Sequence, residues 1–478
     1  MALRCSVATA RSNARYGAQG AGRPDATQVA VARRAEVAWR QAWDLERTSC
    51  AACAGLSARR AAGCVPGPRD RTVGAPPRLT SLLLNIAHAI DHMFLLIFAS
   101  AVGSIAAEFG FARWEDLMPY GAGAFALFGI GSLPAGRLGD LWGRRRMMLV
   151  FFFGMGVAAI CVALTQTAWQ LAIVLTLMGA FSAIYHPVGI PMLVRGARRP
   201  GLTLGFNGLV GNLGVALAAI VTGYLVKYAG WRAAFVVPAF ISFACGALFA
   251  YAAPEEGVAP ARRPITHAML PKGALARVFA IVTVASISAS MLYNFTTNGN
   301  GELLRERLQG IVDDPASLGA LLALVYVAGA LAQVAVGLLL DRVPVKLLYA
   351  GIVAAQVPLF LIAAGASGWS FYASMIAFMV VVFGAIPFTD ALIVRYVDDS
   401  VRSRVSGMRL TVAFGVSSLA VWVLGPLVKA AGFRSLLLLM AGTALVTLCV
   451  VLLLPRTGSA GLGQAAGAQP RGAGASNR

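Results

Sequence analysis

Long apolar runs dominate the sequence from Leu79 onward, and short polar segments separate them. We count twelve runs, most of which reach or exceed the roughly 20 residues that an α-helix needs to cross a hydrocarbon core of about 30 Å. Gly and Pro residues punctuate their boundaries, as at Gly230, Pro254 and Gly432. The pattern predicts an all-α integral membrane protein with twelve transmembrane helices. Their approximate limits are 79–106, 117–137, 146–165, 168–194, 203–227, 231–252, 276–300, 317–340, 345–365, 369–394, 404–429 and 433–454.

The longest polar interval inside the apolar region runs from Pro254 to Lys272 and separates six spans from six. The segment upstream of the first span is Arg-rich and acid-poor, with no sustained apolar period, and we expect it to be a disordered basic extension. A transit peptide is the alternative for such a composition. The predicted order is 1–77 N-terminal extension, 78–253 first six-helix bundle, 254–275 cytoplasmic linker, 276–455 second six-helix bundle and 456–478 disordered tail.

The two groups of six spans repeat one another. The stretch Gly223–Arg232, Gly-Tyr-Leu-Val-Lys-Tyr-Ala-Gly-Trp-Arg, recurs about 200 residues later as Gly425–Arg434, Gly-Pro-Leu-Val-Lys-Ala-Ala-Gly-Phe-Arg. Shared apolar composition would not keep Gly, Lys and Arg in register, so the repeat predicts two pseudo-symmetric six-helix bundles. Three more matches hold nearly the same spacing: Gly136 with Gly337, Asp140 with Asp341, and Pro187 with Pro387.

The number and position of the charged residues indicate where the protein is located and how it is oriented. Of the residues, 58% are hydrophobic and only 13% are charged, whereas soluble domains have about 25% charged residues. The net charge of +20 could indicate nucleic-acid binding, but the basic residues lie in short clusters between apolar spans. Lys and Arg concentrate in the connections after the even-numbered spans, which the positive-inside rule places in the cytoplasm. We therefore predict a multi-pass protein of the cell membrane, in contact with the lipid bilayer and not with nucleic acid, with both termini cytoplasmic.

The connection after span 2 carries the most distinctive motif. The residues Gly136-Arg-Leu-Gly-Asp-Leu-Trp-Gly-Arg-Arg-Arg-Met-Met148 follow one apolar run and lead into the next, which predicts a tight, charged turn. The pattern resembles the loop signature of the major facilitator superfamily, a large group of secondary transporters. The matching positions are Gly136, Asp140, Gly143, Arg144 and Arg145.

That resemblance implies two six-helix bundles that rock about a central site and move a small molecule across the membrane. It also implies that Asp140 meets the positive N-terminal end of span 11, near Ser403–Ser406, and latches the cytoplasmic side. Asp341 keeps the acid of the repeated copy without its arginines, so the latch is expected to be asymmetric. We expect a monomer without cofactor or metal.

Ionisable residues inside membrane spans are costly, and they are treated first as functional candidates. Span 1 has the densest set, in which Asn85, His88 and His92 share one helical face and Asp91 is three residues from His88. Asp91 lies about 18 Å from the cytoplasmic end of the helix. Asp91, assisted by His88 or by His186 of span 4, is the candidate for proton coupling. A purely structural hydrogen-bonded cluster is the alternative.

Further polar residues could contact a solute. In span 4, Pro187 should kink the helix at Tyr185 and His186, while span 5 presents Asn207 and Asn212 among glycines. In span 7, Asn and Gly residues cluster around Asn298, and we expect them to let the helix unwind near its outer end. We also expect an ion pair between Asp390 and Arg409. The candidates for solute contact are Asn85, His92, Tyr185, Asn207, Asn212, Asn294 and Asn298.

A span-1 His followed by an acid, Tyr185-His186-Pro187, and Gly211-Asn-Leu-Gly214 together resemble the fosmidomycin-resistance branch of the superfamily. This resemblance implies proton-driven drug export. Uptake of an organic acid or other metabolite and a non-transporting receptor stay open as alternatives. The sequence has no Gly-x-x-x-x-Gly-Lys phosphate loop and no recognisable catalytic or metal-ligand spacing in a loop. We therefore expect no enzymatic activity.

Overall fold

The structure is a computed structural model that describes residues 76–195, 197, 200–255, 272–340, 342–388 and 399–454. Every regular element in these ranges is a helix. Most of the predicted N-terminal extension, most of the linker and the whole tail lie outside the described residues, so the predictions made for them stay predictions.

The first half of the helical unit corresponds to predicted spans 1–6. Span 2 begins as two short turns before its main helix, and span 4 is split into three pieces. The elements are α3 (Arg78–Glu108), α4 (Trp114–Leu117), η1 (Met118–Gly121), α5 (Ala122–Trp142), α6 (Arg144–Ala163), α7 (Ala168–Ser182), η2 (Tyr185–Gly189), α8 (Ile190–Val194), α9 (Pro200–Ala229) and α10 (Trp231–Ala252).

The second half contains α11 (Lys272–Leu308), α12 (Pro315–Leu340), α13 (Val345–Gly365), α14 (Gly368–Gly384) and α16 (Asp399–Leu452). Eleven helices of the described chain are long and apolar enough to cross a membrane. The last of them, α16, breaks at Gly432, whose φ of 73° is outside the helical range, so it supplies two spans. The prediction of twelve transmembrane helices is therefore confirmed, and the protein is a multi-pass membrane protein.

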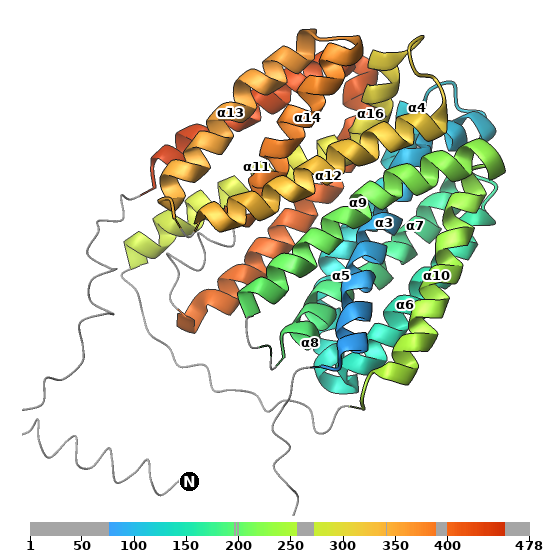
Figure 1. Ribbon diagram of the computed structural model, residues 1–478, viewed down its shortest axis with the longest axis vertical. Helices are drawn as coiled ribbons and strands as arrows, with labels where there is room; N and C mark the ends of the chain where they lie inside the picture. Colours follow the sequence, from blue (N-terminus) through green and yellow to red (C-terminus); the bar gives the residue numbers. More distant parts are fainter. Residues whose placement is uncertain are drawn as a thin grey trace, which may run out of the picture. The chain divides into compact units, whose positions relative to one another are not determined.

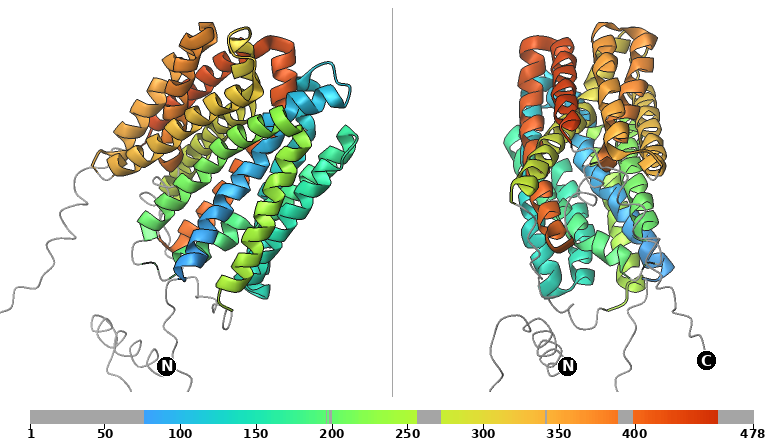
Figure 2. Two further views of the ribbon diagram at one scale, coloured as in Figure 1. Left: turned by 45° about the vertical axis from the view of Figure 1, so that its right-hand side comes forward. Right: turned by 90° about the vertical axis from the view of Figure 1, so that its left-hand side faces the viewer.

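The halves meet along a few long helices. In the first half α3 packs along α9, and α9 in turn packs along α12 of the second half. Figures 1 and 2 show α9 and α12 running side by side. A second line of contact joins α5 to α16. Residues on α3, α5, α9, α12 and α16 are thus placed closest to the interface between the halves.

The turn after span 2 is much shorter than predicted. Helix α5 continues to Trp142 and α6 begins at Arg144, so Gly143 alone forms the turn, with φ 92° and ψ 141°. Glycine has no Cβ and tolerates this positive φ, which lets one residue reverse the chain. The expected turn over Gly136–Met148 was therefore wrong in extent, because Gly136 and Asp140 are helical.

Helix α11 also differs from expectation. It runs without interruption to Leu308, so the predicted unwinding near Asn298 is wrong. The polar side chains there bond back to the helix instead. Asn298 Nδ2 donates to the Asn294 carbonyl at 3.1 Å, and Thr297 Oγ1 donates to the Tyr293 carbonyl at 2.7 Å. Such local bonds use the side-chain donors and leave the backbone ladder intact, while Asn298 Oδ1 has no hydrogen-bond partner within the described residues.

The repeated Gly-x-x-x-Lys segments join the two halves at one end of the helices. We call this the outer end, because the positive-inside rule predicts that it faces away from the cytoplasm. Lys227 Nζ of α9 lies 2.8 Å from Asp314 Oδ1 just before α12, and Lys429 of α16 pairs with Asp116 of α4. A Cβ on Gly223 would strike the Pro315 carbonyl, and one on Gly425 would strike that of Glu115. Each half therefore contributes one glycine and one lysine to the same kind of contact.

Candidate functional site

A break in span 4 turns two side chains toward span 1. The segment η2, Tyr185–Gly189, is a π-helical turn between α7 and α8. Pro187 has no backbone N–H and cannot continue the α-helical ladder, and single π-helical turns are frequent at functional sites. Gly136 and Gly139 of α5 lie against Pro187 and Val188, where a Cβ on Gly139 would crowd Val188. These motif glycines therefore make room for the π-helical turn.

Asp91 of α3 is completely buried beside this turn. Ser182 Oγ donates a hydrogen bond to Asp91 Oδ1. The second carboxylate oxygen, Oδ2, makes no hydrogen bond within the described residues and lies 3.6 Å from His186 Nε2. Of the two histidines predicted to assist Asp91, the structure places His186 directly beside it. Sequence reasoning missed Ser182, which lies one helical turn before His186. One carboxylate oxygen is thus held by Ser182, and the other faces a histidine.

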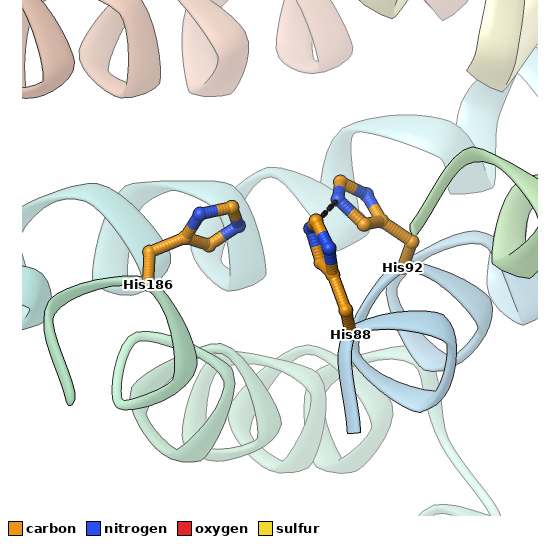
Figure 3. Close-up of side chains that lie close together, drawn as sticks. All are labelled: His88, His92 and His186. Atoms are coloured by element: carbon orange, nitrogen blue, oxygen red, sulfur yellow. Dashed lines mark hydrogen bonds between the residues drawn. The ribbon is translucent and has the colours of Figure 1, made fainter. Parts of the chain in front are cut away.

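His88 is fixed by contacts with α9 and η2. Its Nδ1 lies 2.8 Å from the backbone carbonyl of Asn207, which can only accept, so Nδ1 carries the proton. Its Nε2 then presents a lone pair to His92 Nε2, 3.1 Å away (Figure 3). The ring also stacks on Tyr185, with centroids 4.8 Å apart. Gly211 of α9 leaves the space for this ring, since a Cβ there would lie 2.5 Å from it.

Asn207 connects three elements of the first half. Its Nδ2 donates to the Tyr185 hydroxyl at 2.7 Å and to Asn85 Oδ1 at 3.1 Å, while its carbonyl accepts from His88. The structure therefore gathers most of the predicted residues of spans 1, 4 and 5 into one group. This group, which we call the first-half cluster, consists of Asn85, His88, Asp91, His92, Ser182, Tyr185, His186 and Asn207.

The predicted residues of the second half form a separate group. Asn294 Nδ2 donates to Ser417 Oγ of α16 at 2.8 Å, and Asn298 bonds back to Asn294. Within the described residues, no hydrogen bond links these two asparagines to the first-half cluster. Asn212 of α9 instead crosses between the halves and donates to Gln333 Oε1 of α12. The side chains of the second-half group are uncharged. The histidines and the aspartate all belong to the first-half cluster.

The superfamily motif lies at the opposite end from the outer contacts. Asp140 is exposed on α5. Arg145 donates to the backbone carbonyls of Ala250 and Ala253 and so caps the C-terminal end of α10. Asp341, Asp390 and the side chain of Arg409 lie outside the described residues. The latch at Asp140 and the ion pair of Asp390 with Arg409 therefore stay predictions.

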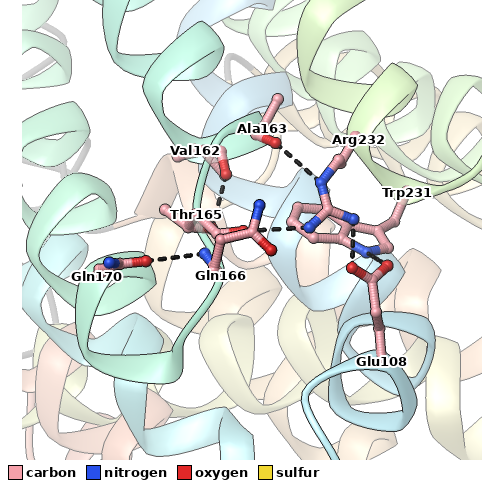
Figure 4. Close-up of polar contacts among 8 residues, drawn as sticks. All are labelled: Glu108, Val162, Ala163, Thr165, Gln166, Gln170, Trp231 and Arg232. Carbon is pink, nitrogen blue, oxygen red and sulfur yellow. Dashed lines mark hydrogen bonds and ion pairs between the residues drawn. The ribbon is translucent and has the colours of Figure 1, made fainter.

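A polar network braces the outer end of the first half (Figure 4). Glu108 at the end of α3 accepts from Arg232 and, at 2.7 Å, from Trp231 Nε1 of α10. Arg232 also donates to the carbonyls of Ala163 at 2.9 Å and Thr165 at 3.1 Å. The network ties α3, α10 and the connection after α6 together. It gives Trp231 and Arg232, the last two residues of the first copy of the repeat, a structural role.

Comparison with known proteins agrees with this architecture. Residues 84–299 match the family model of the Major Facilitator Superfamily. A crystal structure of a bacterial homologue of the human lysosomal transporter Spinster, inward-facing and unoccupied, superposes with a TM-score of 0.64 at 11% identity and covers 78% of this chain and 96% of that one. A nucleoside transporter superposes with a TM-score of 0.60 at 14% identity, covering 78% and 99%. The chain has the Major Facilitator Superfamily fold; the fosmidomycin-resistance branch stays a prediction.

Several curated proteins are similar over part of their length. A probable actinorhodin transporter of Streptomyces coelicolor is 26% identical over 213 residues, which is 41% of this chain and 36% of that protein. A tetracenomycin C resistance and export protein of Streptomyces glaucescens is 32% identical over 108 residues, 22% and 20% of the two chains. The puromycin resistance protein of Streptomyces alboniger is 29% identical over 103 residues, 21% and 20%. The chain thus spans about a third or less of the length of these relatives.

Proposed function

We propose that the protein is a secondary transporter that moves a small organic solute by alternating access. The observation that carries this proposal is the paired contact at the outer end. Lys227 with Asp314 and Lys429 with Asp116 join the halves there, while Asp140 at the other end is exposed. Two half-units that close symmetrically at one end are suited to rock about a site between them. The membrane orientation, with both termini cytoplasmic in the cell membrane, belongs to this proposal, as does a monomeric state.

Export of a drug-like solute is the direction that the relatives favour. Three similar proteins are named for the transport of, or resistance to, antibiotics. Uptake of a metabolite is the alternative, because the same fold and the same buried carboxylate could serve either direction. A deletion strain screened for growth on antibiotics and on carbon sources distinguishes the two. Increased antibiotic sensitivity supports export, whereas a lost carbon source supports uptake.

Asp91 is the proposed proton-coupling residue, assisted by His88 and His186. Buried carboxylates and histidines inside membrane spans commonly form proton relays. Among the residues that the structure describes, Asp91 Oδ2 has no hydrogen-bond partner, and it faces His186. A proton can therefore be taken up at this atom without breaking the bond from Ser182. Because the cluster links α3, η2 and α9, a change in its bonding can be passed to three spans at once.

Solute contact is assigned to amide, hydroxyl and imidazole groups of the two halves. Asn85, His92, Tyr185 and Asn207 belong to the first-half cluster, and Asn294 and Asn298 lie on α11. Asn212 is placed where the halves meet, through its bond to Gln333. Neutral donors and acceptors of this kind suit a polar organic solute better than a simple ion.

The direct test uses purified protein in proteoliposomes with an imposed proton gradient. The readouts are accumulation of the antibiotic found in the growth screen and movement of protons, measured with a pH-sensitive dye. Wild-type protein should show both, and dissipating the gradient should stop accumulation. Solute movement at the same rate with and without the proton gradient would contradict proton coupling. If no solute moves at all, the receptor alternative is favoured.

Asp140 is the proposed cytoplasmic latch. Because it is exposed when the outer end is closed, its predicted partner at the start of α16 should be engaged only in the opposite state. Asp140→Asn should therefore slow transport and leave solute affinity unchanged. A loss of affinity at normal transport rate would argue against the latch.

A further inference from the structure

The three histidines of the first-half cluster are arranged as metal ligands. One ring nitrogen from each of His88, His92 and His186 can be chosen so that all three lie within 4.8 Å of one another. They come from two spans, since His88 and His92 are one turn apart on α3 and His186 belongs to the π-helical turn. Figure 3 shows the three rings turned toward a common space.

The geometry of His88 and His92 is close to that of a ligand pair. Two nitrogens bound tetrahedrally to Zn²⁺ at about 2.0–2.1 Å are about 3.4 Å apart. The two Nε2 atoms lie 3.1 Å apart, so a small rotation of either ring separates them enough. The ligand atom of His186 lies within 4.8 Å of the other two, so it must move closer to them when a metal binds.

The surroundings of His88 also match those of a metal-bound histidine. Such histidines almost always donate their other ring N–H to a carbonyl or carboxylate, which fixes the tautomer and aims the lone pair at the metal. His88 Nδ1 donates to the Asn207 carbonyl at 2.8 Å, which leaves Nε2 as the ligand atom. The His88 ring stacks on Tyr185, and the lack of a Cβ on Gly211 leaves room for it. These contacts therefore orient the His88 ring for metal binding before any metal binds.

A carboxyl group lies next to the three rings and can balance the charge of a bound cation by giving up its proton. Asp91 is fully buried, and its Oδ2 lies 3.6 Å from His186 Nε2 and makes no hydrogen bond in the part of the chain that the structure describes. This separation also fits two ligands of one metal. A cation inside a membrane protein needs such a counter-charge. His186 keeps 19% of its side chain exposed, so the site is not completely enclosed.

We propose that His88, His92 and His186 bind a divalent transition-metal cation, with Asp91 as its counter-charge. Imidazole nitrogen favours Zn²⁺, Cu²⁺ and Ni²⁺, whereas Mg²⁺ and Ca²⁺ take oxygen ligands. The bound cation would tie α3 to the π-helical turn of span 4. If the proposed transport function holds, occupancy of the site blocks the movement of these spans and inhibits transport.

The test is the binding of Zn²⁺ to the full-length protein in detergent micelles at fixed pH, by isothermal titration calorimetry after removal of metal with a chelator. Cys50 and Cys53 could take up zinc independently, so both are replaced by serine in every sample. We expect one Zn²⁺ per chain and no binding of Mg²⁺. Each of His88→Gln, His92→Gln and His186→Gln should weaken binding by about tenfold or more. The absorption of bound Co²⁺ then reports nitrogen coordination directly.

His267→Gln is the matched control, since it removes the fourth and last histidine of the chain. It should bind Zn²⁺ like the parent protein, and the thermal melting of all variants without metal shows whether they fold. Unchanged binding in the folded triple variant, or equal binding of Mg²⁺, would overturn the proposal. Zinc inhibition of transport is measured separately. Binding without any transport would leave the metal site standing and reject the proposed function, while transport without zinc binding would do the reverse.

Discussion

Lys227 of the first half and Lys429 of the second make equivalent contacts, because each forms an ion pair with an aspartate of the other half at the outer end. The middle of the helices is different. There α3 carries His88, Asp91 and His92, whereas the middle of α11, the first long helix of the second half, carries Asn294 and other neutral groups. The buried carboxylate of α11, Glu302, lies about two turns before the end of that helix at Leu308. The repeat is thus kept where the halves touch at the outer end and lost at the central positions.

This comparison separates two kinds of constraint. Each contact at the outer end needs a lysine on one half and an aspartate on the other. A substitution of one of these residues therefore requires a matching substitution in the other half. The central positions face no such requirement, and one half can carry ionisable groups while the other supplies neutral donors and acceptors. We therefore infer that the first half couples energy and that the second half mainly completes the solute site and the gates.

The sharpest test of this division is Asp91→Asn. It keeps the shape of the side chain and removes its charge, so proton-coupled flux in proteoliposomes should fall to the level of empty liposomes. Asn294→Ala in the second half should alter solute affinity and leave the coupling to protons intact. Wild-type coupling in Asp91→Asn would contradict the assignment.

Close helix packing should also differ between the halves. A Cβ on Gly214 would clash with the backbone of Ala89, so Gly214→Ala must push α3 and α9 apart, at a cost of about 1–3 kcal/mol in stability. Gly415 of α16 has open space around it, and Gly415→Ala should melt at or slightly above the wild-type temperature. Thermal melting in detergent measures both. Equal destabilisation of the two variants would contradict the packing described here.

Asn207 and Asn294 form a matched pair of buried asparagines. Asn207→Ala leaves the Tyr185 hydroxyl and Asn85 without their shared donor, whereas Ser417 keeps its bond to the Ala413 carbonyl when Asn294 is removed. Asn207→Ala should therefore be the more destabilising by about 1 kcal/mol. Denaturation of each variant in the same detergent gives the comparison, and the opposite order would show that Asn207 does not organise the cluster.

The smallest effect is expected at the exposed outer contacts. The hydrogen bonds from Lys227 and Ser317 lower the pKa of the Asp314 carboxyl to about 2, from an ordinary value of about 3.9. A lowered pKa means that the contact stabilises the closed outer end above about pH 4 and is lost as the pH falls toward 2. Asp314→Asn should thus melt slightly below wild type at pH 6, and the difference should vanish near pH 2. A difference that persists at low pH would have another origin.

The sequence by itself determined the class of the protein and much of its site. Each membrane helix satisfies its backbone hydrogen bonds within its own segment, so length and hydropathy suffice to predict the spans, and Gly432 marks the break in α16. Helical periodicity likewise predicts that His88, Asp91 and His92 lie close together. The repeat was readable because its glycines and lysines are retained in register.

Only the tertiary structure decided how the spans meet. The π-helical turn that brings His186 to Asp91, the bond from Ser182, and the pairing of each lysine with the opposite half depend on the rotation of helices about their own axes. That rotation is set by close contacts such as Gly211 with His88 and Gly214 with Ala89. These contacts join residues more than a hundred positions apart, and no local pattern in the chain encodes their distance.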